Sequence, residues 1–203
     1  MDAAARIRRL GLPIETPRLV LRLPEQRDVP DLRRGFRDPR TARAEGAQIH
    51  SAQVRKDPRK LVARTRREYR LGEHLSLSVI RREGSRCIGR VGLRGLSWTR
   101  SKAESLAYWI DPAYWNRGFA TEASWFLCDA AFRSLRFRRI GSGALEGNTA
   151  SMAVLRRLGF VEEGRERKAV VVRGRTLDMI LFGLLREELP SERTMRAVWA
   201  PTT

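Results

Sequence analysis

Residues 114 to 124 read YWNRGFATEAS and combine side chains that suit the binding of an anion. Gly118 and Ala120 leave the backbone accessible, Arg117 adds a positive charge, and Thr121 adds a hydroxyl. The following run has a helical pattern, and the first turn of a helix carries unpaired N–H groups at the positive end of its dipole. The segment favours a pyrophosphate held at a helix start. A glycine that only makes the helix start tight is the alternative.

The elements before this segment follow from hydrophobic period and from capping residues. Alternation predicts a strand over 16–24 that ends near Pro24. A capping aspartate predicts a helix over 28–36, and Asp57 with a proline after it predicts a second helix closed by Gly72. Three antiparallel strands are then expected over 75–79, 87–95 and 103–110, with a turn at 82–86.

The elements after the segment begin with a helix over 119–134, which is apolar on nearly every side and therefore buried against a sheet. A strand over 138–147, a helix over 148–159 and a hairpin turning near Gly174 follow. Only the two strands that flank the helix of 119–134 need to run parallel, joined by a right-handed crossover. Beyond residue 189, either a short helix packing through Met195 and Trp199 or a loose tail is expected.

Composition limits the class of protein. A chain of 203 residues with 42% hydrophobic residues suits one globular domain. The sequence lacks a long apolar run and a secretory signal, so we expect a cytoplasmic protein that does not enter a membrane. Cys87 and Cys128 are expected to be buried core residues, and His50 and His74 surface residues, so no metal site is predicted. The net charge of +18 fits a nucleic-acid surface, an acidic substrate or an arginine-rich composition without binding meaning.

Four segments carry a resemblance to a known family: TPRLVLR, LAYWIDPAYWNRGFATEA, GNTASMAVLRRLGF and TLDMILFGLLREE. In this order and spacing the chain resembles the GNAT superfamily of acyl-CoA-dependent N-acetyltransferases, and within it the RimJ/RimL-type ribosomal-protein N-terminal acetyltransferases. The resemblance covers 16–189, between an N-terminal extension (1–15) and a C-terminal tail or short helix (190–203). It implies a single α+β domain with a mixed, mostly antiparallel twisted sheet of about seven strands and about four helices.

The resemblance also implies acetyl-CoA as cosubstrate, with no metal. The loop would hold the pyrophosphate through backbone amides, and the pantetheine would lie along 108–111. The chain departs from the family at Trp115, where Gln or Arg is usual, and at Asn116, where close relatives often have glycine; asparagine tolerates positive φ angles. The cofactor-binding residues that we expect are Trp109, Ile110, Asp111, Asn116, Arg117, Gly118, Phe119, Ala120, Thr121, Asn148 and Ser151.

The family chemistry implies an attack of a neutral amine on the thioester. A strand N–H near Trp109 or Ile110 would hold the carbonyl oxygen. Many relatives protonate the leaving thiolate with a tyrosine, but the matching position here is Leu155, so Ser151 is the candidate donor; a plain residue in the first helical turn is the alternative.

Two catalytic residues are thus expected: Ser151 as the proton donor and Glu104 as the general base. Relatives place a glutamate at the position of Ser105, one residue further along the strand. Because strand side chains alternate faces, Glu104 would need a β-bulge to reach the site.

The acceptor is expected to be a primary amine, either a protein N-terminus or a small molecule. In the family the two early helices wall the acceptor site, and here the second is basic, at Arg59, Lys60, Arg64, Arg66, Arg67 and Arg70. A solvated face, an acidic substrate segment and ribosomal RNA remain open as explanations, as do a monomer and a homodimer. The rival functions are an acetyl-CoA-binding protein with little turnover and a basic nucleic-acid-binding module.

Overall fold

A computed structural model describes residues 3–44, 57–172 and 174–199, without the side chains of 42–44, 58 and 104. Its centre is one eight-stranded sheet in the order β1-β2-β3-β4-β5-β6-β8-β7. The strands are β1 (Ile14–Glu15), β2 (Leu19–Arg22), β3 (Leu75–Arg81), β4 (Cys87–Ser97), β5 (Lys102–Ile110), β6 (Arg139–Leu145), β7 (Val161–Val172) and β8 (Arg175–Leu185). Only β5 and β6 pair in parallel, and every other neighbouring pair is antiparallel. The predicted α+β class and the single parallel pair are confirmed.

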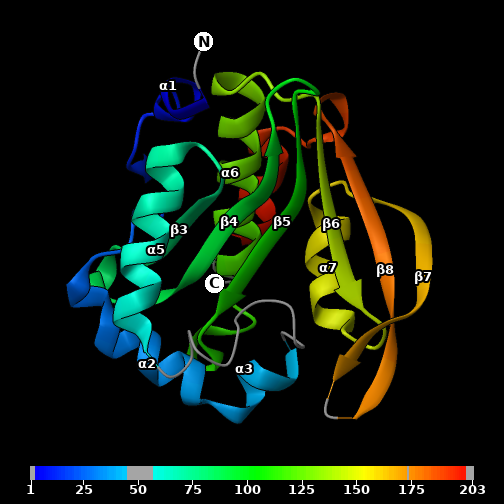
Figure 1. Cartoon of the computed structure of the whole chain (residues 1–203), viewed down its shortest axis with the longest axis horizontal. Helices are drawn as coiled ribbons and strands as arrows, with labels where there is room; N and C mark the ends of the chain where they lie inside the picture. The colour runs from blue at the N-terminus through cyan, green and yellow to red at the C-terminus, as the bar shows by residue number, and fades with distance from the viewer. Residues whose placement is uncertain (1–2, 45–56, 173, 200–203) are drawn as a thin grey trace.

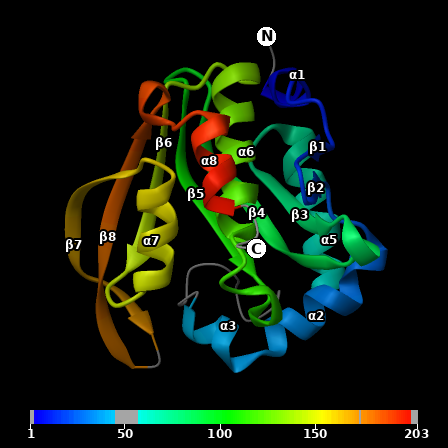
Figure 2. The same ribbon diagram turned by 180° about the vertical axis from the view of Figure 1, so that it is seen from behind.

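Helices cover both faces of the sheet (Figures 1 and 2). On the face toward the viewer in Figure 1 lie α2 and α5; on the opposite face, seen in Figure 2, lie α6, α7 and α8. The described helices are α1 (Ala3–Arg8), α2 (Val29–Arg37), α3 (Pro39–Ala44), α5 (Pro58–Leu71), α6 (Phe119–Ser134), α7 (Thr149–Arg157) and α8 (Glu192–Trp199). Short 3₁₀ turns occupy Gln26–Asp28, Glu83–Ser85, Pro112–Tyr114 and Arg186–Glu188.

Two apolar cores follow from this layering. The larger core joins the α6 face of the sheet to α6, α7 and α8, with α1 at its edge through the fully buried Ile7. The smaller core lies between the other face and α2 and α5, where Leu32, Phe36, Leu61 and Trp109 meet. Helix α6 is buried on most of its surface, as its composition predicts. The sheet is therefore fixed from both sides, and the ends of its central strands have defined positions.

Two local features differ from the sequence prediction, and a third decides between the two alternatives predicted for the C-terminal segment. Asp28 does not cap α2 with its side chain; it is buried and instead accepts hydrogen bonds from Arg22 and Ser78. Strand β7 begins at Val161, well before the predicted hairpin, because an edge strand exposed on both faces shows no apolar alternation. The C-terminal segment forms the helix α8, which packs through Met195 and Trp199.

Candidate active site

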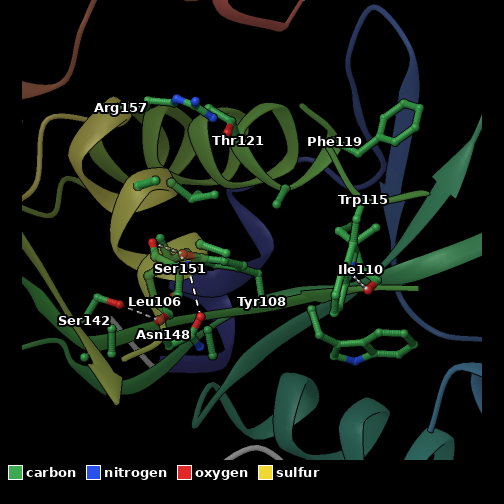
Figure 3. Close-up of a pocket in the computed structure, with 18 of the residues that line it drawn as sticks. Leu106, Tyr108, Ile110, Trp115, Phe119, Thr121, Ser142, Asn148, Ser151 and Arg157 are labelled. Atoms are coloured by element: carbon green, nitrogen blue, oxygen red, sulfur yellow. Dashed lines mark hydrogen bonds between the residues drawn. The ribbon is translucent and has the colours of Figure 1, made fainter. Parts of the chain in front are cut away.

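The central strands β5 and β6 separate part-way along their length. Their parallel register pairs Lys102 with Arg139 and Ala103 with Ile140, and it ends at Leu106 with Ser142, although both strands continue beyond this point. Here the Ser142 hydroxyl donates to the Leu106 carbonyl oxygen at 3.0 Å. Beyond this bond a cavity of about 400 Å³ opens between the strands, α6 and α7 (Figure 3).

The backbone of β5 presents alternate amides to the opening. The Leu106 carbonyl points toward β6, so the peptide groups of Tyr108 and Ile110 face the same side, whereas those of Trp109 face β4, its paired neighbour. The Trp109 side chain packs in the smaller core against Phe36, with ring centroids 5.0 Å apart. Of the two residues expected to hold the thioester oxygen, Ile110 therefore has the better-placed N–H.

The loop before α6 has the geometry that its residues predict. Asn116 and Gly118 both adopt left-handed backbone angles, with φ of 58° and 73°. Helix α6 starts at Phe119, and the first helical N–H group that bonds back within the described backbone is that of Glu122, which donates to the Gly118 carbonyl at 2.9 Å. The amides of 119–121 are thus the free donors at the positive end of a helix, and Ala120 and the buried Thr121 line the cavity beside them.

A partly buried ion pair holds this loop to the start of the sheet. The fully buried carboxylate of Glu122 accepts a hydrogen bond from the Thr16 hydroxyl at 2.6 Å, from the Arg18 backbone N–H at 2.9 Å and from Arg18 Nε at 2.6 Å. The Arg18 guanidinium also donates to the Arg117 carbonyl at 2.9 Å and lies over the Phe119 ring. Glu122 is therefore an anchor of the helix start, and the sequence pattern does not reveal its partner Arg18.

The residues that flank the loop have separate tasks. Trp115 donates its indole N–H to the Ile110 carbonyl at 2.6 Å, which ties the loop to the end of β5. Asp111, expected among the cofactor-binding residues, uses its buried carboxylate to cap the turn at the Ala113 N–H and to bind Arg34. The structure therefore gives Asp111 a structural task, while Trp115 lines the cavity.

A second hollow, of about 880 Å³, adjoins the outer side of the loop. It shares Asn116, Gly118, Phe119 and Arg157 with the first cavity. Its charged lining consists of Arg18, Arg81, Arg82, Arg117, Arg157 and one glutamate, Glu83. Such a surface suits a ligand with several negative charges. The predicted contribution of Arg117 thus falls on the outer hollow and not on the inner cavity.

At the inner end of the cavity, Ser151 stands in the first turn of α7. The Asn148 side chain caps this helix by accepting the Ser151 N–H at 3.2 Å. The Tyr108 hydroxyl lies 3.0 Å from Ser151 Oγ and 3.1 Å from the Ser151 carbonyl oxygen (Figure 3). Burial raises the pKa of Tyr108 above its usual range, so the phenol stays protonated at neutral pH. Sequence reasoning assigned no chemistry to Tyr108, because nothing in the pattern links β5 to α7.

The β-bulge that Glu104 would need is present. Between Ala103 and Leu106, β5 has one residue more than the facing segment of β6. Such a bulge re-aims the side chains beside it. The side chain of Glu104 lies outside the described residues, so its role as a base stays a prediction; Ser105 lines the cavity.

The cysteines, the histidines and Asp178 have the following surroundings. Cys87 and Cys128 are buried free thiols, as predicted, and burial raises the pKa of Cys87 to about 12. His74 accepts the Gly95 N–H, and His50 lies outside the described residues. Asp178 accepts the Lys168 N–H across the β7–β8 hairpin. Within the described residues, no cluster of metal ligands and no helix able to cross a membrane is found.

Comparison with known proteins places this geometry in a family. The acetyltransferase (GNAT) domain profile matches residues 18–161. The candidate ribosomal N-acetyltransferase YdaF of Bacillus subtilis (strain 168) is 36% identical over 111 residues, which are 55% of this chain and 60% of YdaF. The uncharacterized N-acetyltransferase p20 of Bacillus licheniformis is 33% identical over 117 residues, 58% of this chain and 65% of p20. The chain thus spans less than two thirds of the length of these two relatives.

Solved structures agree in fold. RimJ of Mycobacterium smegmatis, solved with CoA-disulfide, has a TM-score of 0.74 at 25% identity and covers 90% of this chain and 88% of its own. RimL, an L7/L12 α-N-protein acetyltransferase solved with coenzyme A, has a TM-score of 0.75 at 20% identity and covers 85% of this chain and 97% of its own. A separated pair of central strands, a left-handed loop at a helix start and the profile match lead to one conclusion: the chain belongs to the GNAT family of acetyltransferases.

Proposed function

We propose that the chain transfers an acetyl group from acetyl-CoA to a primary amine, by direct attack within a ternary complex. The observation that carries this proposal is the continuity of the site: the Arg-lined hollow, the loop with its free amides and the cavity that Ser151 lines share residues with one another. An elongated ligand with phosphates at one end and a thioester at the other fits this order of groups.

Each part of acetyl-CoA has a matching surface. The amides of 119–121 and the dipole of α6 suit the pyrophosphate. The hollow with Arg157 suits the remaining phosphate charge, and the unpaired edge of β5 suits the amide groups of the pantetheine. We propose that the Ile110 N–H polarises the thioester carbonyl, a stabilisation fixed before reaction. Ser151 is the proposed donor to the leaving sulfur.

The acceptor that we propose is the α-amine of a protein N-terminus, with a small amine as the alternative. The names of relatives and of the neighbours RimJ and RimL support the first choice. The basic side chains of α5 that the sequence singles out are exposed, while Leu61 and Val62 face the core. Arg66 donates to the Pro24 carbonyl and Arg64 pairs with Glu68. The remaining charges of α5 stay available to an acidic partner.

The test is thiol release from acetyl-CoA in the presence of peptides with a free N-terminus and a panel of small amines. Amine-dependent release of free thiol, with acetylated product by mass spectrometry, is the expected result. Acetyl-CoA binding by calorimetry without transfer to any amine would instead favour the rival binding protein, and absence of binding would overturn both.

Ionic strength separates the acceptor classes in the same assay. Capture of an acidic peptide by the α5 face predicts that the KM for the peptide rises steeply with salt while the KM for acetyl-CoA changes less. A flat response would remove the acidic-partner part of the proposal.

A separate variant tests the proposed general base. Glu104→Gln should lower turnover and shift the pH profile of turnover; an unchanged turnover and profile would exclude Glu104.

A further inference from the structure

We infer that Tyr108 is a positioning residue that directs the hydroxyl proton of Ser151 toward the sulfur of CoA while the thioester bond breaks. The inference rests on the proposed function, because it assumes that CoA occupies the cavity. It assigns a task to the Tyr108 side chain on β5, and it explains how a hydroxyl pair serves where the chain has the buried Leu155.

The two hydroxyls come from elements far apart in the chain and meet inside the cavity. Tyr108 lies on β5 and Ser151 in the first turn of α7, and both line the opening (Figure 3). The Asn148 cap fixes the Ser151 backbone at 3.2 Å, but a cap does not choose the side-chain rotamer. Contact with Tyr108 at 3.0 Å does so, because it holds Oγ at one place on the wall.

Counting protons shows why the partner matters. A hydroxyl has one proton and two lone pairs. The Tyr108 proton can be donated either to the Ser151 carbonyl at 3.1 Å or to Ser151 Oγ at 3.0 Å. When Tyr108 donates to Ser151 Oγ, Ser151 can donate its own single proton to a third group. Such a group would lie in the cavity. A developing negative charge on sulfur favours this arrangement, since it gains a donor.

The reaction balances without a proton leaving the tyrosine. The amine nitrogen forms the new N–C bond and gives up one proton to water, the electron pair of the C–S bond passes to sulfur, and the sulfur leaves as a thiolate that takes up one proton from water. A thiol with a pKa of roughly 8.5 is a far stronger acid than a serine hydroxyl, so Ser151 stabilises the thiolate by a hydrogen bond and is not itself consumed.

The surroundings keep Tyr108 neutral throughout. Burial raises the pKa of its phenol, and the neighbouring thiol of Cys128 on α6 is also held protonated by burial. The cationic side chains that line the cavity are Arg94 and Arg157. The tyrosine therefore acts as a hydrogen-bond donor of fixed charge, which is what a positioning role requires.

The experiment titrates the thiol of bound CoA through the ultraviolet absorbance of its thiolate, so it needs no acceptor. In the wild type, a donor at the sulfur favours ionisation. Ser151→Ala and Tyr108→Phe should each lower the acid dissociation constant of the bound thiol, by about tenfold and about fivefold. In the Ser151→Ala background, Tyr108→Phe should change it by less than about twofold, because the two act in series.

The matched control is Tyr69→Phe on α5, a partly buried tyrosine outside the site, which should leave the thiol titration unchanged. An equal effect of Tyr108→Phe with and without Ser151, or none, overturns the inference while the proposed function stands. Failure of the wild type to bind CoA overturns both. Should Tyr108→Phe not fold, a crystal structure of the wild type with CoA decides: a sulfur more than about 4 Å from Ser151 Oγ refutes the inference.

Discussion

The two ends of the site are built in different ways. At the loop before α6, the groups offered to a ligand are backbone amides of neighbouring residues, given their direction by the left-handed angles of Asn116 and Gly118. At the inner end, the groups are side chains from two elements, Tyr108 on β5 and Ser151 on α7. The first end depends on local conformation, and the second on how the sheet and α7 pack.

This difference predicts different responses to substitution. A local amide array fails when its conformation or its anchor is lost, so stability and CoA affinity should fall together. A side-chain pair can lose its chemistry while the fold and the affinity remain. The following variants test this contrast, in order of expected effect on stability.

The largest effect is expected from Glu122→Gln, which removes the buried charge that holds Arg18 and Thr16 at the loop. Because the Arg18 guanidinium would stay largely buried without its counter-ion, we expect the free energy of unfolding to fall by about 3 kcal/mol. Denaturant titration measures this loss, and calorimetry should show weaker CoA binding. The control Glu192→Gln breaks an exposed i,i+4 pair with Arg196 and should cost less than about 0.5 kcal/mol. Similar losses in both variants would contradict the anchoring role.

Gly118→Ala should have the next largest effect. Its φ of 73° costs an alanine about 1–2 kcal/mol. In addition, the new Cβ would lie 3.2 Å from Trp199 Cα and 3.3 Å from Arg18 Nη2. We expect CoA affinity to fall about tenfold, as measured by calorimetry.

Gly174→Ala is the matched control for that variant, because Gly174 has a φ of 76° and no atom within 4 Å of the added Cβ. It should lose only the roughly 1–2 kcal/mol that the positive φ costs an alanine, with CoA affinity intact. A comparable loss of affinity in both variants would show that strain, and not the contact at the loop, is responsible.

The smallest effect is expected from Ser142→Ala, at the point where β5 and β6 separate. It leaves the Leu106 carbonyl without its 3.0 Å donor, which should cost about 1 kcal/mol of unfolding free energy. CoA affinity should change less than about twofold, since no amide of the loop is disturbed. A fall in affinity as large as that of Gly118→Ala would mean that the two ends of the site are coupled through the sheet.

The same contrast explains what could be predicted from sequence. The strand and helix periods, the glycines at 72, 118 and 174, and the asparagine with positive φ are local properties, and the structure confirms them. The order of the central strands follows from one crossover. The family could be inferred because its motifs are segments of continuous chain.

Long-range partners could not be predicted in this way. Glu122 lies in the first turn of α6, but its pairing with Arg18 joins residues 104 positions apart. Asp28 was expected to cap a helix, and a bidentate arginine displaced that role. The contact between Tyr108 and Ser151 likewise depends on three-dimensional packing. When a polar group has several available partners, the tertiary structure determines which one it binds, and local sequence patterns do not contain that information.

The separation of β5 from β6 also matters for self-association. Strand edges with free peptide groups ordinarily invite pairing with another chain, and proteins usually protect them at the rim of a sheet. Here the free edges face each other inside a wedge that is closed at one end by the pairing of Leu106 with Ser142 and flanked by α6 and α7. A slender ligand can enter such a wedge more easily than a second sheet can. The fold thus keeps reactive edges for a small molecule without offering them as a seed for aggregation.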